Sequence, residues 1–289
     1  MTKINICGVP EHFNLPWHLC IENNEFRAEN LDVNWINVPE GTGKMCQMLR
    51  SGETDIAILL TEGIVKDIEA GNPSKIVQIY VESPLVWGIH VAATSDFYEI
   101  SDLQHKKIAI SRKGSGSELM AIVHAKSQHW NVSGLNFEIV NTLDGAVAAL
   151  SNGQADYFMW EKFMTKPLVD SGIFRRIGEC PTPWPCFVIA VREGFLKNND
   201  NEIKNLLEVI NRQTKIIKSI ENIADVFAEK YNLKAKDVAQ WLAETTWCQR
   251  NLTENELSKV QIHLFDLDLI DKKSTFNSIV SIALNNTND

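Results

Sequence analysis

The sequence lacks an apolar run long enough to cross a membrane as a helix. Such a helix needs about 20 consecutive apolar residues, whereas the most apolar stretch, residues 83–93, is shorter and contains His90. The first residues also lack the basic segment and apolar core of an export signal. We therefore expect no membrane span and, for the chain as written, a cytoplasmic location. A chain trimmed at its amino end would belong in the periplasm or at the cell surface.

Positive charge is also scarce. The 289 residues include 28 lysines and arginines against 37 acidic residues, which gives a formal net charge of −9 at pH 7. Proteins that bind nucleic acid usually concentrate lysine and arginine on one face to neutralise phosphates. No segment here has that density of basic residues, so we expect no nucleic acid as a partner.

Metal-binding and nucleophile motifs are missing as well. The six cysteines show no C-x-x-C spacing, so we expect buried free thiols, with a Cys180–Cys186 disulfide as the alternative. His12 and His18 do not have the spacing of metal ligands, and no histidine has the context of a serine-histidine-aspartate triad. The sequence thus predicts no metal and no cofactor, and it designates no catalytic residue.

What the sequence does contain is one pattern that occurs twice. Residues 49–55, LRSGETD, and 150–156, LSNGQAD, share the form Leu-x-x-Gly-x-x-Asp. In both copies a helix-like apolar segment comes before the pattern and a strand-like segment after it. A single pair of copies is too few for a solenoid. It predicts two related α/β lobes with a ligand cleft between them, and we expect Asp55 and Asp156 to be structural.

Alternating strand and helix patterns extend this prediction along the chain. Strands are predicted at 3–9, 32–38, 55–60, 75–93 with a break at 82–84, 107–111, 136–140, 156–160 and 188–191. Helices are predicted at 17–27, 42–51, 61–71, 116–129, 144–151 and over most of the chain after 201. Strands that alternate with helices indicate βαβ units and parallel sheets. Thr253 and Glu256 have the spacing of a capping box, and the polar residues 285–289 are expected to fray.

The predicted fold is an α/β protein with two hinged lobes. Lobe 1 would comprise residues 1–92 and 185–289, including the carboxyl-terminal helices, and lobe 2 would comprise residues 93–184. The chain would cross between the lobes near 90–95 and 181–186. Proteins of this architecture close on their ligand by hinge rotation.

Candidate ligand contacts follow from the rule that ligands bind at the carboxyl ends of parallel strands, beside the amino ends of helices. The strongest candidate is SRKGSGSEL at 111–119, where Gly116 permits close backbone approach and Ser115 and Glu118 have capping-box spacing. It is neither a Walker loop nor a dinucleotide fingerprint. We expect the first helix amides, together with Arg112, to bind an anionic or strongly polar end of the ligand. An ordinary capped turn is the alternative.

Other candidates occupy equivalent positions, each with a structural alternative. Thr42 and Gly43 open the helix of the first lobe, where a simple cap also explains them. Trp160 can stack on a planar ligand or pack in the core, and Trp184 can line the cleft or plug the hinge. The acidic strand-end residues would instead favour an amine or a neutral ligand. The candidate contacts at this stage are Glu11, His12, Thr42, Gly43, Thr61, Glu62, Arg112, Ser115, Gly116, Ser117, Trp160, Glu161 and Trp184.

Three segments carry a resemblance to a known family: GTGKMCQMLRSGETDIAILLTEG at 41–63, DLQHKKIAISRKGSGSELMA at 102–121 and LDGAVAALSNGQADYFMWEKF at 143–163. They resemble the type II periplasmic-binding-protein fold, in particular the substrate-binding components of nitrate, sulfonate, taurine and thiamine-precursor ABC importers. The likeness covers roughly residues 3–250 and implies binding of a small-molecule ligand, with an ABC permease as a possible partner. It adds Ser83 to the candidate contacts. Its motifs are specific for the superfamily and almost silent about the ligand.

The same fold also resembles cytosolic enzymes, among them enzymes of the menaquinone pathway and a pyrimidine synthase of thiamine biosynthesis. The absence of an export signal points toward this group. For the pyrimidine synthase, however, neither a cysteine-rich iron-binding run nor a clear pyridoxal lysine is present. A non-catalytic binder of small molecules is therefore the main expectation, and an enzyme on the same fold or a regulatory module is the alternative.

Overall fold

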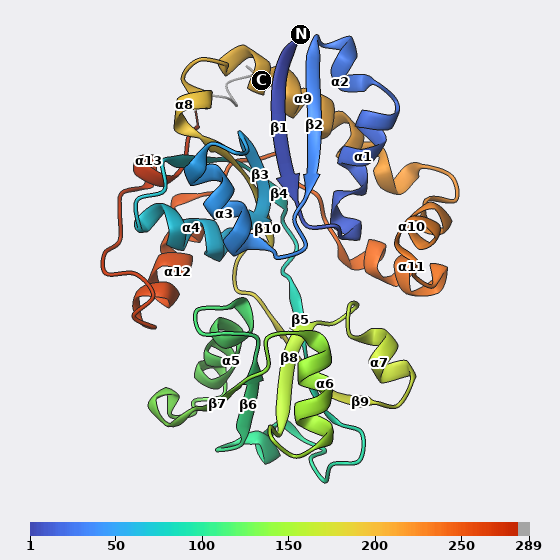
Figure 1. Ribbon diagram of the computed structural model, residues 1–289, viewed down its shortest axis with the longest axis vertical. Coiled ribbons are helices and arrows are strands. Elements are labelled where there is room, and N and C mark those ends of the chain that lie inside the picture. Colours follow the sequence, from blue (N-terminus) through green and yellow to red (C-terminus); the bar gives the residue numbers. More distant parts are fainter. Residues whose placement is uncertain (283–289) are drawn as a thin grey trace. The chain divides into compact units, whose positions relative to one another are not determined.

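The computed structural model describes residues 1–282, and the prediction for 285–289 lies outside them. The chain divides into two compact units (Figure 1). Unit 1 comprises Met1–Ser83 and Trp184–Asp289, and unit 2 comprises Pro84–Pro183. Each unit has its own mixed sheet with helices packed against it.

Unit 1 is built on a five-stranded sheet in the order β2-β1-β3-β10-β4. Strand β1 (Thr2–Gly8) pairs in parallel with β2 (Leu31–Asn37) and with β3 (Ile56–Leu60). Strand β10 (Phe187–Arg192) runs antiparallel between β3 and β4 (Ser74–Val81). Because β10 follows unit 2 in the sequence, this sheet is complete only after the chain has returned from unit 2.

Helices lie on both sides of this sheet (Figure 1). The crossover from β1 to β2 and the crossover from β2 to β3 run in opposite directions along the sheet, so their helices lie on opposite faces. Helix α9 packs on α1 and α2, and α12 packs on α4. The helices of unit 1 are η1 (His12–Asn14), α1 (Leu15–Glu22), α2 (Glu25–Ala28), α3 (Thr42–Ser51), α4 (Thr61–Glu69), α8 (Glu193–Leu196), α9 (Asp200–Ile216), η4 (Ile217–Ser219), α10 (Ile223–Tyr231), α11 (Ala235–Glu244), α12 (Glu254–Phe265) and α13 (Phe276–Ile279).

Unit 2 repeats the plan with the order β7-β6-β8-β5-β9. Strand β6 (Lys107–Ile110) pairs in parallel with β7 (Asn136–Ile139) and β8 (Tyr157–Glu161). Strand β5 (Val86–Ala92) runs antiparallel between β8 and β9 (Phe174–Pro181). Its helices are η2 (Ile100–Leu103), α5 (Gly116–Ser127), η3 (Val132–Gly134), α6 (Leu143–Ser151) and α7 (Lys166–Asp170). The predicted α/β class is confirmed, and the two sheets share one topology.

The repeated sequence pattern makes equivalent hydrogen bonds in each unit. The Asp55 carboxylate accepts a hydrogen bond of 3.0 Å from the amide of Asn5 in β1, and the Asp156 carboxylate accepts one of 2.7 Å from the amide of Lys107 in β6. The preceding glycines, Gly52 and Gly153, have φ angles of +75° and +68°, which favour glycine because a side chain there is strained. Each copy thus ends a helix and ties the next strand to the neighbouring parallel strand, β1 or β6.

Several expectations differ from the structure. The helix predicted at 17–27 is broken, because Asn24 has a φ of 58° between α1 and α2. Gly41, not Thr42, is the N-cap residue of α3. Strand β9 was not predicted. The first boundary between units lies at 83/84, earlier than 92/93, because β5 pairs with β8 and β9 and therefore belongs to the sheet of unit 2.

Burial follows from the sheet architecture. Strands β3 and β10 are buried along almost their whole length, as expected for strands covered on both faces. All six cysteines are buried and free, which confirms the expected thiols and not the alternative disulfide. Among residues 1–282, no helix combines the length and the apolar character that a bilayer crossing requires.

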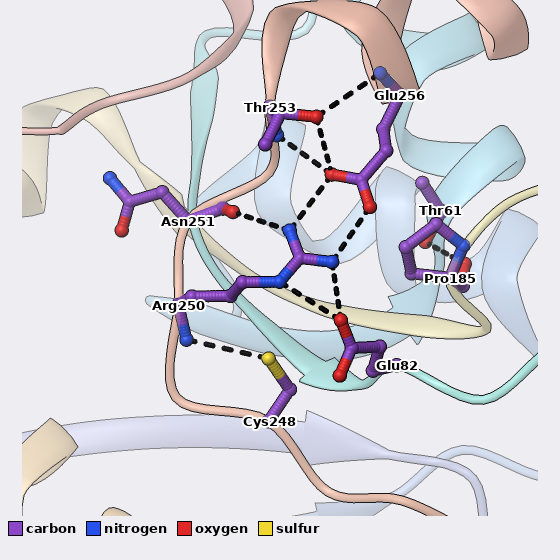
Figure 2. A network of polar contacts seen from close by, with 8 residues as sticks. All are labelled: Thr61, Glu82, Pro185, Cys248, Arg250, Asn251, Thr253 and Glu256. Carbon is purple, nitrogen blue, oxygen red and sulfur yellow. Dashed lines mark hydrogen bonds and ion pairs between the residues drawn. The ribbon is translucent and has the colours of Figure 1, made fainter.

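One ionic network fastens the carboxyl-terminal helices to the outer edge of β4. The backbone of 246–250 pairs with this edge, and the Arg250 guanidinium then bridges two carboxylates (Figure 2). Its Nε and Nη2 donate to Glu82 at 2.9 and 2.5 Å, and its Nη1 and Nη2 donate to Glu256 at 2.9 and 2.7 Å. Glu256 also closes the predicted capping box with Thr253. The bonds from Arg250 lower the pKa of Glu256 to about 2.

We expect Arg250→Ala to lower the free energy of unfolding by roughly 1–2 kcal/mol. Charged hydrogen bonds contribute about 1.5–3 kcal/mol each, but the half-exposed position of Arg250 screens them. Arg212→Ala is the matched control, because Arg212 makes one exposed ion pair with Glu29 at 3.5 Å; it should cost less than about 0.5 kcal/mol. Urea denaturation measures both, and equal costs would contradict this account of the network.

Candidate functional site

Each sheet has a topological switch point at its central parallel strand. The chain leaves β1 toward β2 and returns on the other side at β3, and it does the same around β6. Ligands of open α/β sheets bind at such points, outside the carboxyl ends of the strands. The antiparallel strands start at the same edges, because Phe187 pairs with Leu60 and Trp87 pairs with Glu161. The start of each antiparallel strand therefore lies at the edge where the parallel strands end.

In unit 2 the switch point is occupied by the start of α5. Ser115 is the N-cap residue, and its hydroxyl accepts a bond of 3.3 Å from the amide of Glu118. The Glu118 carboxylate accepts a bond of 2.5 Å from the amide of Gly114. The next two amides, those of Gly116 and Ser117, have no acceptor among residues 1–282. They point out of the first turn of a helix, where the dipole favours negative charge.

Serine hydroxyls lie beside these amides, and one arginine belongs to the preceding loop. The Ser117 hydroxyl accepts a bond of 2.9 Å from the amide of Ser111 and lies 3.0 Å from the Ser115 hydroxyl. Both Ser115 and Ser117 are buried. If Ser117 donates to Ser115, the Ser115 proton is left for an outside acceptor. Arg112 is exposed, and no hydrogen bond or ion pair holds its side chain within residues 1–282. This segment can therefore offer several donors to an anion.

Two tryptophans form the aromatic side of this site. Trp87 packs against Gly116 so closely that a Cβ atom added there would lie 3.2 Å from its Cη2 atom. Trp160 is half-buried, meets Trp87 edge-to-face at 6.0 Å and stacks on Phe158 at 5.4 Å. Sequence reasoning missed Trp87, because a tryptophan inside the apolar run 83–93 reads as core. Its one signal was its place at the start of the strand after a chain crossing.

The carboxylate of Glu161 is used inside unit 2. Its Oε2 atom accepts hydrogen bonds from the amides of Phe163 and Met164 at 2.9 and 2.7 Å. The side chain is buried. Its negative charge is therefore largely committed to the turn that leads into α7, although its predicted ligand contact stays a prediction.

In unit 1 the end of β3 brings three predicted residues together. Thr61 donates to the carbonyl of Pro185 at 2.6 Å, as drawn in Figure 2. The indole N–H of Trp184 donates to the Glu62 carboxylate at 2.8 Å. Glu62 is 4% exposed, and this burial raises its pKa to about 7. A carboxyl group with this pKa can carry or release a proton near neutral pH.

The loop after β1 places Glu11 and His12 at the neighbouring position. Burial raises the pKa of the half-buried Glu11 to about 7 and lowers the pKa of His12 to about 3. The neutral His12 ring lies in an aromatic cluster, 4.1 Å from Trp241 and 6.3 Å from Tyr231 between ring centroids. Sequence reasoning did not foresee that α10 and α11 supply this cluster.

Two of the three remaining predicted contacts have structural partners. The Thr42 hydroxyl accepts a bond of 3.3 Å from the amide of Leu60 and so ties the start of α3 to the end of β3. Gly43 is the next residue of α3. The Ser83 hydroxyl accepts a bond of 3.0 Å from the amide of Thr246. The structure thus groups Arg112, Ser115, Gly116, Ser117 and Trp160 in unit 2, and Thr61, Glu62 and Trp184 in unit 1.

Comparison with known families and curated proteins gives one partial match. The family model described as Ca3427-like PBP matches residues 87–180, the greater part of unit 2. The curated proteins include no match to this chain.

Solved structures match over nearly the whole chain. The CA3427 gene product of Candida albicans, described as defining a new family with the generic periplasmic binding protein fold, is 24% identical with a TM-score of 0.86, and the match covers 97% of this chain and 96% of that chain. The aliphatic sulphonate binding protein SsuA of Escherichia coli is 18% identical with a TM-score of 0.79, over 96% and 92%. The alkanesulfonate-binding protein SsuA of Xanthomonas axonopodis pv. citri, bound to MOPS, is 15% identical with a TM-score of 0.81, over 98% and 99%.

At these identities the likeness concerns the fold. The two mixed sheets, their shared strand order and the matches to solved structures agree. The chain has the type II periplasmic-binding-protein fold.

Proposed function

We propose that this protein binds a small solute with an anionic or strongly polar end, and that binding itself is its function. One observation carries the proposal: the amides of Gly116 and Ser117 lack acceptors at the start of α5, beside buried serine hydroxyls and the unpaired Arg112. These donors sit at a topological switch point, where α/β folds bind ligands.

The energetics favour an anion at this position. The helix dipole stabilises a negative charge by about 0.3–1 kcal/mol at exposed sites and up to about 2 kcal/mol when the site is partly buried. Each charge-assisted hydrogen bond contributes about 1.5–3 kcal/mol.

The solved relatives suggest which anions to try first. SsuA of Escherichia coli is an aliphatic sulphonate binding protein, and SsuA of Xanthomonas axonopodis pv. citri was solved with MOPS. Alkanesulfonates are therefore our first candidates as ligands of this chain. A role as the substrate-binding component of an ABC importer would follow, with a permease as the partner.

A second candidate function is an enzyme on the same fold. The observation in its favour is that Glu11 and Glu62 both have a pKa near 7 and follow adjacent parallel strands. Carboxyl groups tuned to neutral pH are typical of general acids and bases. Incubation with a mixture of candidate metabolites, followed by mass spectrometry, separates the two: turnover of any metabolite would favour the enzyme over the binder.

We expect Arg112→Ala to weaken binding of an alkanesulfonate tenfold to a hundredfold, which corresponds to the loss of about 1.5–3 kcal/mol from one charged hydrogen bond. The melting temperature of the ligand-free protein should stay unchanged, because the exposed Arg112 packs against no core. Isothermal titration with MOPS and butanesulfonate measures the affinities.

Lys113→Ala is the control for this experiment. Lys113 is an exposed cation on the same loop, but a lysine has no bidentate guanidinium. Its loss should change the affinity less than threefold, a rough limit for a screened surface charge. If Arg112→Ala leaves sulfonate affinity untouched, the anion anchor is assigned to the wrong residue. If both variants weaken binding equally, general surface charge explains the effect.

We expect Glu62 to make stability depend on pH. Its folded pKa of about 7 lies above the usual unfolded value of about 4.3. The native state therefore holds this proton more tightly, so the stabilisation is present in full below about pH 4 and is lost as pH rises through 7. The total change is roughly 3–4 kcal/mol, because a shift of one pKa unit corresponds to about 1.4 kcal/mol.

Glu62→Gln should remove this part of the pH dependence, because the amide does not titrate and can still accept the bond from Trp184. Denaturation from pH 4 to 8 compares the two proteins, with Glu53→Gln as the exposed control. Parallel pH profiles for wild type and Glu62→Gln would show that folding does not raise the pKa of Glu62.

A further inference from the structure

We propose that Trp87 selects the head group of the ligand: its indole N–H is a third donor at the start of α5, so the site prefers a tetrahedral head with three oxygens to a planar carboxylate. This inference rests on the proposed binding function and deepens it. It concerns a residue that the sequence analysis did not single out.

The position of Trp87 follows from strand pairing. Strand β5 runs antiparallel to β8, and Trp87 pairs with Glu161, the last residue of β8. The amino end of β5 therefore lies at the carboxyl edge of the parallel strands, next to the loop that follows β6. Trp160 meets the Trp87 ring edge-to-face at 6.0 Å, with 75° between the ring planes. The ring is thus fixed from one side by another tryptophan.

The indole N–H of Trp87 is buried without an acceptor. Trp87 is 5% exposed, and its Nε1 atom has no hydrogen-bond partner among residues 1–282. A buried tryptophan N–H usually finds a partner, because leaving it unpaired is unfavourable. Trp184 in unit 1 follows that rule by donating to Glu62 at 2.8 Å. Trp87 is therefore a donor that still lacks its acceptor.

The six-membered ring of Trp87 faces α5. A Cβ atom at Gly116 would lie 3.2 Å from Cη2 and 3.4 Å from Cζ2 of Trp87. Cζ2 and Nε1 are bonded to the same ring carbon, so the N–H group is next to the ring edge that contacts the first turn of α5. The free amides of Gly116 and Ser117 belong to that turn. The unpaired indole thus packs on the turn that carries the free amides and the Ser115 hydroxyl.

The number of donors decides which head group fits. A sulfonate or phosphonate presents three oxygens, whereas a carboxylate presents two in one plane. A carboxylate that accepts bonds from the two α5 amides leaves the Trp87 N–H unpaired and gains no affinity from it. A tetrahedral head can pair with all three donors. Removing the indole N–H should therefore weaken sulfonate binding more than carboxylate binding.

The test compares three probes of similar chain length: butanesulfonate, butylphosphonate and pentanoate. For the wild type, isothermal titration should give at least tenfold tighter binding of butanesulfonate than of pentanoate. Trp87→Phe keeps an aromatic ring but removes the N–H, and it should weaken the two tetrahedral probes about tenfold while changing pentanoate less than threefold. Trp130→Phe is the matched control, because Trp130 packs on His124 elsewhere in unit 2; it should change none of the affinities.

A second variant tests the proposal in case Trp87→Phe does not fold. Gly116→Ala keeps the indole but pushes it, since the new methyl group would meet Cη2 at 3.2 Å, and it should also narrow the preference for butanesulfonate over pentanoate. If the wild type binds butanesulfonate and neither variant narrows the ratio of the butanesulfonate and pentanoate affinities, Trp87 does not select the head group. The proposed binding function then still stands. If the wild type binds none of the three probes, the proposed anion binding itself fails, and the inference on Trp87 fails with it.

Discussion

The architecture depends on the strand that follows each of the two chain crossings between the units. Strand β10 sits between β3 and β4, although it follows unit 2 in sequence, and β5 sits between β8 and β9, although it follows unit 1. Neither sheet is complete without a strand that arrives through a chain crossing. This constraint places the starts of β10 and β5 beside the carboxyl ends of the parallel strands. It therefore brings Trp184 to the switch point of unit 1 and Trp87 to that of unit 2.

The two switch points have the same topology and different chemistry. The one in unit 2 presents backbone amides, serine hydroxyls and Arg112, all of which can donate hydrogen bonds. The one in unit 1 presents Glu11 and Glu62, whose burial raises their pKa to about 7. The proposal of a binding protein draws on the hydrogen-bond donors of unit 2, and the enzyme alternative draws on the two carboxyl groups of unit 1.

Much of the fold was predictable from local patterns. The paired Leu-x-x-Gly-x-x-Asp segments predicted two related α/β units, because the turn needs a glycine and the aspartate ties two strands together. The capping box of Thr253 and Glu256 was also predictable from spacing alone. Strand β9 was not, since it is an edge strand with charged residues such as Arg175 and Glu179, and edges carry charges that mask the strand pattern. Trp87 was missed for the opposite reason: an apolar run does not tell which of its residues reaches a site.

Native mass spectrometry of freshly purified protein tests the central claim most directly, because it detects a bound solute without assuming its identity. We predict one added small-molecule mass per chain, displaced by excess butanesulfonate and identified as an organic acid after release. A chain that carries no added mass, and that also takes up no anionic compound from a complete metabolite extract, would contradict the proposed function.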